Sequence, residues 1–369
     1  MILANLYPLK TVILGSLFAL GLVLLMPSTS NASASHELFK GPNGISVSGG
    51  HVWVTNVATL NKGGDWITEL KASNGSLVRI INASADEFSN VGEIAVSGGH
   101  VWVTNSGTPS ISDFGTPSTV DSVIELNASN GSLVRVISAS ADEFVTPNGI
   151  AVSGRHVWVA NWGGTSVTEL NASNGSLERV ISASADEFVT PNGITVSGGH
   201  VWVTNLEGDS VTELNASNGS LVRVIKAKGN NDLNSPNGIT VSGGHVWVTN
   251  SGGTSITELN ASNGSLVRVI NPQGNGNFDN AGGITVSGGH VWVTNQKDDA
   301  VTELNASNGS LVRVIKASAD EFSEPVGIAV SGGHVWVTNI GTLNKEGDLK
   351  GDSVTELNAS NGSFVRAIK

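Results

Sequence analysis

The side chains best suited to acid–base or metal chemistry are eight histidines, and seven of them occupy one position of a repeat. These seven open successive His-Val-Trp-Val or closely similar segments at His51, His100, His156, His200, His245, His290 and His334, and the eighth is His36. A metal needs ligands that converge to about 2 Å from the ion. Because seven repeat copies start far apart, we predict no metal ligands among them.

Other chemistry-bearing motifs are scarce. The chain has no P-loop, dinucleotide fingerprint, Ser-His-Asp arrangement or zinc-type spacing, so we predict no catalytic residues and no cofactor. Calcium is an alternative because oxygen ligands suffice for it, and acidic pairs recur between the repeats. These pairs are Asp86/Glu87, Asp142/Glu143, Asp186/Glu187 and Asp320/Glu321. No EF-hand spacing accompanies them, and solvated acidic turns are the commoner explanation.

The repeats must position whatever site the protein has. Successive repeat histidines are 44 to 56 residues apart, and each copy contains four short β-rich runs, as at 194–197, 201–204, 211–214 and 221–225. A period of this length predicts a propeller or solenoid. We predict an all-β, seven-bladed β-propeller with four antiparallel strands per blade over residues 35–369. The copies start near Phe39, Phe88, Phe144, Phe188, Leu233, Phe278 and Phe322, which we interpret as apolar plugs between blades.

The third and fourth runs of each copy form a predicted hairpin. Asn-Gly between two β-rich runs is a strong turn signal, and a left-handed Gly219 would place Glu213 opposite Arg223. Opposite charges facing each other across a ladder fix the register. The pair recurs as Glu69/Arg79, Glu125/Arg135, Glu169/Arg179, Glu258/Arg268, Glu303/Arg313 and Glu356/Arg366. We therefore interpret these charges as structural.

The N-terminus and the composition point to export. An apolar run over 11–26 is followed by Ala32-Ser33-Ala34, which predicts a secretory signal peptide over residues 1–34. The alternative is an uncleaved membrane anchor. The net charge of −12 argues against nucleic acid as a partner, and the chain has no cysteine. We expect a monomer of prokaryotic origin, secreted or in the cell envelope, that binds an unknown small molecule, glycan or protein there.

The repeat pattern also has a family resemblance. Pro191-Asn-Gly-Ile-Thr-Val-Ser-Gly-Gly-His-Val-Trp-Val-Thr-Asn205 resembles the repeat of YVTN/NHL-type β-propellers, a group that includes streptogramin B (virginiamycin B) lyase. The resemblance covers the repeats and implies four-stranded blades around a central channel. The lyase has Trp-Phe-Thr-Glu in its repeats, with His and Glu near a metal. The matching Trp202-Val-Thr-Asn205 has no Glu, which puts that activity in doubt.

Departures from the repeat mark the expected binding site. The connection between the second and third strands is short in blades 3 to 6 but spans 57–66 in blade 1, 106–122 in blade 2 and 340–353 in blade 7. In a closed ring these three blades are neighbours, and function on repeat scaffolds often lies in such loops. The candidate ligand-binding residues are Lys62, Asp65, Trp66, Asp113, Phe114, Trp162, Lys345 and Asp348. Tolerated insertion is the alternative.

Three functional classes stay open on the sequence. An acidic propeller with one asymmetric face and no catalytic constellation favours a secreted binding or interaction module. A lyase of the streptogramin B type is an alternative that rests on fold analogy. A structural envelope protein is another, since the repeats are nearly identical. The predicted ligand face is the one that carries the long connections of blades 7, 1 and 2.

Overall fold

Short β-branched runs separated by glycine-rich turns fold into four-stranded antiparallel sheets, as predicted. The computed structural model describes residues 37–57, 65–82, 88–107, 121–138, 144–182, 188–226, 229, 232–271, 278–316, 322–343 and 349–369. The predicted signal peptide lies outside these residues. Among them, no helix has the length and hydrophobicity needed to cross a membrane.

Each of the seven blades takes its four strands from consecutive sequence. Blade 1 has β1 (Pro42–Ser48), β2 (His51–Asn56), β3 (Trp66–Lys71) and β4 (Leu77–Asn82). Blade 2 has β5 (Val91–Ser97), β6 (His100–Ser106), β7 (Asp121–Asn127) and β8 (Leu133–Ser138). Blade 3 has β9 (Pro147–Ser153), β10 (His156–Asn161), β11 (Ser166–Asn171) and β12 (Leu177–Ser182). Blade 4 has β13 (Pro191–Ser197), β14 (His200–Asn205), β15 (Ser210–Asn215) and β16 (Leu221–Lys226).

The second half of the chain repeats this plan. Blade 5 has β17 (Pro236–Ser242), β18 (His245–Asn250), β19 (Ser255–Asn260) and β20 (Leu266–Ile270). Blade 6 has β21 (Ala281–Ser287), β22 (His290–Asn295), β23 (Ala300–Asn305) and β24 (Leu311–Lys316). Blade 7 has β25 (Pro325–Ser331), β26 (His334–Asn339), β29 (Ser353–Asn358) and β30 (Phe364–Ile368). The small ribbon β27 (Thr342–Leu343) and β28 (Leu349–Lys350) lies between β26 and β29.

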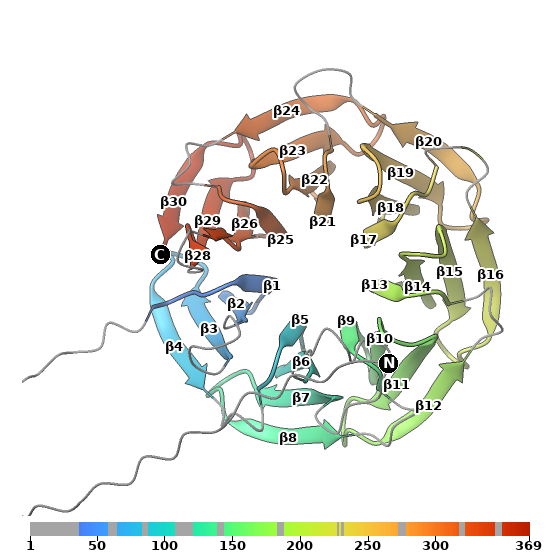
Figure 1. Ribbon diagram of the computed structural model, residues 1–369, viewed down its shortest axis with the longest axis horizontal. Coiled ribbons are helices and arrows are strands. Elements are labelled where there is room, and N and C mark those ends of the chain that lie inside the picture. Colours follow the sequence, from blue (N-terminus) through green and yellow to red (C-terminus); the bar gives the residue numbers. More distant parts are fainter. Residues whose placement is uncertain are drawn as a thin grey trace, which may run out of the picture. The chain divides into compact units, whose positions relative to one another are not determined.

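The blades close into a ring without exchanging a strand between the chain ends (Figure 1). The first strand of every blade faces the centre, and the fourth lies on the rim. Blade 7 meets blade 1 directly, where Thr338 donates a hydrogen bond to the carbonyl of Asn43. The predicted closed disc of seven complete units is therefore confirmed, and blades 7, 1 and 2 are neighbours.

The hydrophobic core lies between blades. Trp53 of blade 1 packs in one cluster with Phe88, which opens blade 2, and with Val101 and Val103 of β6. The seven Trp residues of the second strands are at most 1% exposed, and the residues that open the blades are at most 3% exposed. Fully burying one such aromatic side chain removes ~150–250 Å² from water. The opening Phe and Leu residues thus fill the space between neighbouring sheets.

The repeat histidine completes an ion-pair network in every blade. In blade 4, Glu213 pairs with Arg223 across the ladder as predicted, and Gly219 in the hairpin turn has a φ of 71°. The Glu213 side chain is fully buried, with Oε2 at 2.8 Å from Arg223 Nε and Oε1 at 2.8 Å from His200 Nδ1. Burial raises the pKa of this carboxyl, and the Arg223 and His200 charges oppose the rise. The repeat histidines are therefore structural partners of buried carboxylates.

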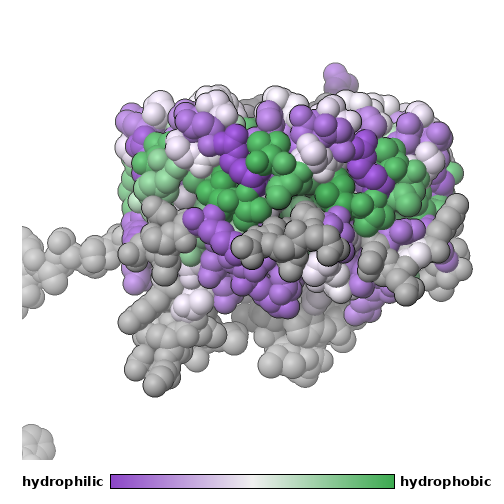
Figure 2. All heavy atoms as spheres, turned by 90° about the horizontal axis from the view of Figure 1, so that it is seen from above, coloured by the Kyte–Doolittle hydropathy of each residue, from purple (hydrophilic) through white to green (hydrophobic). Residues whose placement is uncertain are grey.

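The rim carries an apolar band (Figure 2). The large hydrophobic residues that are exposed among the described residues all belong to fourth strands, namely Leu77, Leu133, Val134, Leu177, Leu221, Val222, Leu266, Val267, Leu311, Val312, Phe364 and Val365. Most of these come from the Leu-Val pair that opens the fourth strand. Blade 3 departs from this pair, because Glu178 follows Leu177.

Candidate functional site

The innermost strands pack so closely that their third residue is Gly in six blades. A Cβ added at Gly149 would lie 2.1 Å from the carbonyl oxygen of Asn192 in the next blade, and one at Gly283 would lie 2.6 Å from that of Val326. Blade 2 breaks this rule, because its third residue is Glu93. A charged side chain at a position where the fold requires glycine indicates a functional site, since such local violations cost stability.

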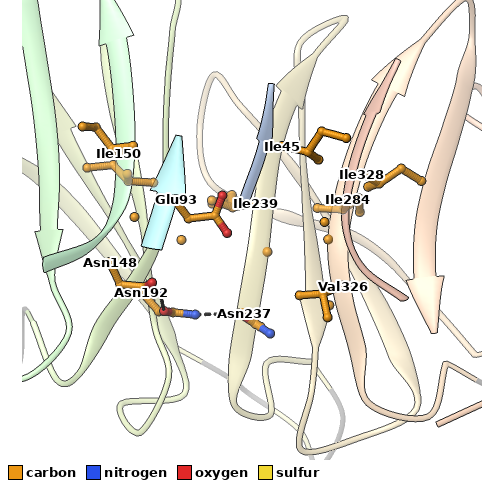
Figure 3. A pocket seen from close by; sticks show the side chains of 17 residues that line it. Ile45, Glu93, Asn148, Ile150, Asn192, Asn237, Ile239, Ile284, Val326 and Ile328 are labelled. Atoms are coloured by element: carbon orange, nitrogen blue, oxygen red, sulfur yellow. Dashed lines mark hydrogen bonds between the residues drawn. The ribbon is translucent and has the colours of Figure 1, made fainter. Parts of the chain in front are cut away.

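Glu93 lies in the central channel of the propeller. A pocket of about 190 Å³ occupies this channel, and its lining comes from the first strands of all seven blades. The Glu93 carboxylate points into the channel, and isoleucine side chains such as Ile45, Ile239 and Ile284 lie around it (Figure 3). The volume is smaller than the ~300–1,000 Å³ of typical small-molecule sites. The channel therefore has room for a group the size of one side chain.

A row of amides lies at one end of this channel. Asn148 donates from Nδ2 to Asn192 Oδ1, and Asn192 donates in turn to Asn237 Oδ1 (Figure 3). These asparagines are the second residues of β9, β13 and β17, so they lie toward the ends at which the first strands begin. Strand direction alternates within a blade, so this is also the face of the connections between second and third strands. The polar end of the channel therefore lies toward the predicted ligand face.

The electrostatic environment of Glu93 suits the binding of a cation. Desolvation by burial raises the pKa of its carboxyl, and a hydrogen bond from the backbone of Ile94 opposes the rise. A carboxylate in apolar surroundings gains more from an opposite charge than one in water, because the local dielectric constant is lower. Among the residues that line the pocket, Glu93 is the only ionisable one. The channel can therefore take up one cationic group.

Asp65, one of the residues predicted to bind ligand, is part of the framework. Its side chain is buried, and Oδ2 accepts a 2.9 Å hydrogen bond from the N–H of Val91 in the next blade. Asp121 in blade 2 and Asp209 in blade 4 accept the equivalent bond from Thr146 and Ser235. This position fastens the third strand of one blade to the first strand of the next. The ligand-binding role of Asp65 stays a prediction.

The two other candidates that the structure describes, Trp66 and Trp162, lie in different blades. Trp66 is half-buried in blade 1, and its Nε1 donates a 3.3 Å hydrogen bond to the carbonyl of Leu38. Trp162 is half-buried in the turn of blade 3, where its backbone N–H bonds to the carbonyl of Thr146. Blade 2 separates the two. Lys62, Asp113, Phe114, Lys345 and Asp348 lie outside the described residues, as do the acidic pairs proposed for calcium.

Our sequence reasoning missed Glu93 and the asparagine row. The signal was present, because Val91-Gly92-Glu93 stands where the other six copies end in Gly, four of them as Pro-Asn-Gly. A single substitution inside a strand is a weaker signal than unequal loops or repeated histidines. Only the closeness of neighbouring first strands shows that this glycine is obligatory and that its replacement faces the channel.

The family follows from a match over most of the propeller. Residues 87–368 match the family described as outer membrane protein assembly factor BamB (PQQ_2). The chain belongs to this BamB family. The match begins just before blade 2 and runs to the last strand, so it covers six of the seven blades described above. In sequence, none of the curated proteins matches this chain.

Solved structures resemble this BamB-family chain in fold. A catalytically inactive virginiamycin B lyase from Staphylococcus aureus, in complex with quinupristin, aligns with a TM-score of 0.67 and 18% identity over 87% of this chain and 96% of the lyase. A putative 6-phosphogluconolactonase from Bacteroides uniformis aligns with a TM-score of 0.63 and 14% identity over 85% of this chain and 94% of its own. The first match shows that this chain shares the β-propeller fold of a lyase from the group that the repeat resembles. Identities this low establish the fold alone.

Proposed function

We propose that this propeller is a binding module of the cell envelope or the secreted fraction, and that its ligand presents a primary amine to the central channel. The observation that carries the proposal is Glu93, a carboxylate placed where the packing of the first strands otherwise requires glycine. The BamB family description, which names outer membrane protein assembly, supports an envelope location. The predicted signal peptide is consistent with it.

The chemistry of the channel favours an alkylammonium group over other cations. The isoleucines offer an apolar wall for a methylene chain, and Glu93 offers an acceptor for the charged end (Figure 3). The amide row at the mouth supplies further donors and acceptors. A lysine side chain of a partner protein and a small free alkylamine share this chemistry. A pocket of about 190 Å³ fits either better than it fits a multi-ring ligand.

The predicted loops belong to the same face. The long connections of blades 7, 1 and 2 would form a wall along one flank of the mouth through which the amine enters, and Glu93 itself comes from blade 2. We propose that Lys62, Asp65, Trp66, Asp113, Phe114, Trp162, Lys345 and Asp348 contact the rest of the ligand there. In this arrangement the channel supplies the anchor and the loops supply the specificity.

Calorimetric titration of the full chain tests whether Glu93 binds a primary amine in the channel. The probes are n-butylamine, an acetyl-lysine amide with a free side-chain amine, and a peptide that contains one lysine, with n-butanol as the neutral counterpart. We expect the amines to bind and n-butanol not to bind. Glu93→Gln and Glu93→Gly should each weaken amine binding by at least about tenfold, which corresponds to ~1.4 kcal/mol.

A matched control and the contrary result complete this test. Glu207 is exposed in the turn between β14 and β15 on the same face, and Glu207→Gln removes a carboxylate without touching the channel. Its amine affinity should equal that of the wild type. Equal affinity in the Glu93 variants, or equal binding of n-butanol, would remove the proposal. Comparison of the free amine with the peptide then distinguishes a small ligand from a protein partner.

A further inference from the structure

Blade 3 carries a side-chain cluster that the other blades lack. His156 Nδ1 lies 2.7 Å from Glu169 Oε1 and 2.9 Å from Glu178 Oε2. Ligand atoms from these three residues all lie within 4.8 Å of one another, and this is the one such group among the described residues. The cluster lies on the face of the turns that join first to second strands. It is therefore on the opposite face from the polar end of the channel.

Glu178 creates the cluster by replacing an apolar residue of the repeat. The other six blades have valine at its position, namely Val78, Val134, Val222, Val267, Val312 and Val365. The ladder between β11 and β12 shifts register between Glu169 and Leu170, whose partners are Arg179 and Leu177. Glu178 is the extra residue of this bulge. Bulges re-aim side chains, and here the carboxylate meets His156 rather than continuing the apolar band of the rim.

Each carboxylate is held at one oxygen and directs the other at the imidazole. Arg179 Nε lies 2.7 Å from Glu169 Oε2, and Asn171 Nδ2 donates a 2.8 Å hydrogen bond to Glu178 Oε1. Such partners orient the ligands of metal sites. Glu169 is fully buried at the base, whereas the His156 and Glu178 side chains are 36% and 22% exposed. The cluster thus has a fixed base and an opening to solvent.

One imidazole hydrogen at His156 Nδ1 faces two carboxylate oxygens, one from Glu169 and one from Glu178. The single hydrogen of a neutral imidazole at Nδ1 can serve one carboxylate, and Nδ1 is hydrogen-bonded to Glu178. Glu169 Oε1 is fully buried without a hydrogen bond of good geometry, as the equivalent oxygen is in every blade, but only in blade 3 does a second carboxylate approach the same Nδ1. A divalent cation between the three atoms would satisfy both carboxylates and the ring nitrogen together.

We propose that His156 Nδ1, Glu169 Oε1 and Glu178 Oε2 bind one divalent transition-metal ion of the zinc type. One imidazole nitrogen with two carboxylate oxygens fits zinc, whereas calcium and magnesium prefer oxygen ligands alone. Bond lengths of about 2.0–2.2 Å require the ligand atoms to separate slightly from their present contacts. Movement of the partly exposed Glu178 can provide this. Three protein ligands with an opening leave a fourth position for water or for a donor from a partner.

The repeat itself supplies the matched variants for a test. Glu178→Val restores the residue of the other blades and should fold normally. Val222→Glu places the missing ligand in blade 4, where His200, Glu213 and Asn215 stand at the equivalent positions. Val78→Glu does the same in blade 1, but there Lys71 replaces the asparagine and would pair with the new carboxylate.

Equilibrium dialysis of the full chain against Zn²⁺, with calcium and magnesium in parallel, gives the stoichiometry. We expect one tightly bound zinc in the wild type and in Val78→Glu, none in Glu178→Val and two in Val222→Glu. Binding should release protons and shift the ¹⁵N resonance of His156 Nδ1, which a merely structural cluster would not show. Zinc binding of equal strength in Glu178→Val, or preference for calcium, would overturn the proposal. A correctly folded Val222→Glu without a second zinc would refute the sufficiency of these ligands.

Discussion

Thr338 in the last blade donates a 2.8 Å hydrogen bond to the carbonyl oxygen of Asn43 in the first, across 295 residues of sequence. The same hydroxyl accepts a 2.8 Å bond from the N–H of Gly327 in its own blade. Equivalent threonines join other neighbouring blades, as Thr204 does with Asn237 and Thr249 with Gly282. The contact that closes the ring is thus the one that joins most neighbouring blades, with blade 3 as the exception because it has Ala160 at this position.

Replacing Thr338 should weaken that closure. Thr338→Val keeps the shape of the side chain but leaves the N–H of Gly327 and the carbonyl of Asn43 without this partner, at a cost of ~1–3 kcal/mol. Thr338→Ser retains the hydroxyl and should lose less. Chemical denaturation followed by tryptophan fluorescence measures both. Equal stability of the valine and serine variants would contradict a role for the hydrogen bond.

Removing the channel carboxylate should stabilise the fold while it abolishes amine binding. Glu93→Gly restores the residue that the other six blades have and removes a desolvated charge from the channel. Because burial raises the pKa of Glu93, ionisation costs folding free energy as the pH rises above the unfolded value. The Tm advantage of Glu93→Gly should therefore grow as the pH rises above about 4. A lower Tm than wild type at about pH 8 would contradict this explanation.

Asp352 makes the junction of blades 7 and 1 sensitive to pH. Desolvation, together with the nearby Glu37 charge, raises its pKa to about 6, although a hydrogen bond from the Gly41 backbone and the Lys40 charge oppose the rise. Since the folded pKa exceeds the ordinary 3.8, the stability associated with the neutral acid is present below about pH 4 and is lost as the pH rises through about 6. Asp352→Asn should gain Tm relative to wild type over this interval.

A control variant distinguishes the effect of titrating Asp352 from the effect of losing a carboxylate that accepts a hydrogen bond. Asp209 has the equivalent position in blade 4, where Oδ1 accepts a 2.8 Å bond from Ser235, but it is exposed. Thermal scans of Asp352→Asn and Asp209→Asn in one pH series make the comparison. A pH trend of the same size in both variants would show that burial of Asp352 is not its cause.

The hairpin glycine should tolerate no side chain. Gly219 has a φ of 71°, and a Cβ there would lie 2.8 Å from Ile181 and 2.9 Å from Arg179 of the preceding blade. Gly219→Ala should cost roughly 1–2 kcal/mol for the left-handed backbone, plus the displacement of those two side chains. Gly199→Ala is the matched control, because Gly199 has a φ of 80° and nothing within 4 Å of its Cβ. Equal losses of stability in the two variants would rule out the contribution of packing between blades.

The sequence by itself determined the architecture. Local patterns carry that information: the β-rich runs, the Asn-Gly turn and the pairing of Glu213 with Arg223 depend on neighbours within one blade. Seven complete copies also determined a ring that closes without strand exchange, since each copy contains its own fourth strand. The aromatic residues that open the blades were interpretable because a repeated Phe beside a repeated Trp has one common use, the core.

Only the tertiary structure decided where the chemistry lies. Glu93 faces the channel because the first strands of different blades approach within contact distance, a long-range effect that no local pattern encodes. His200 reaches Glu213, and Glu178 reaches His156, because adjacent strands and a bulge direct these side chains toward each other. A sequence shows which residue departs from its repeat. The physical meaning of the departure depends on what the folded chain places opposite it.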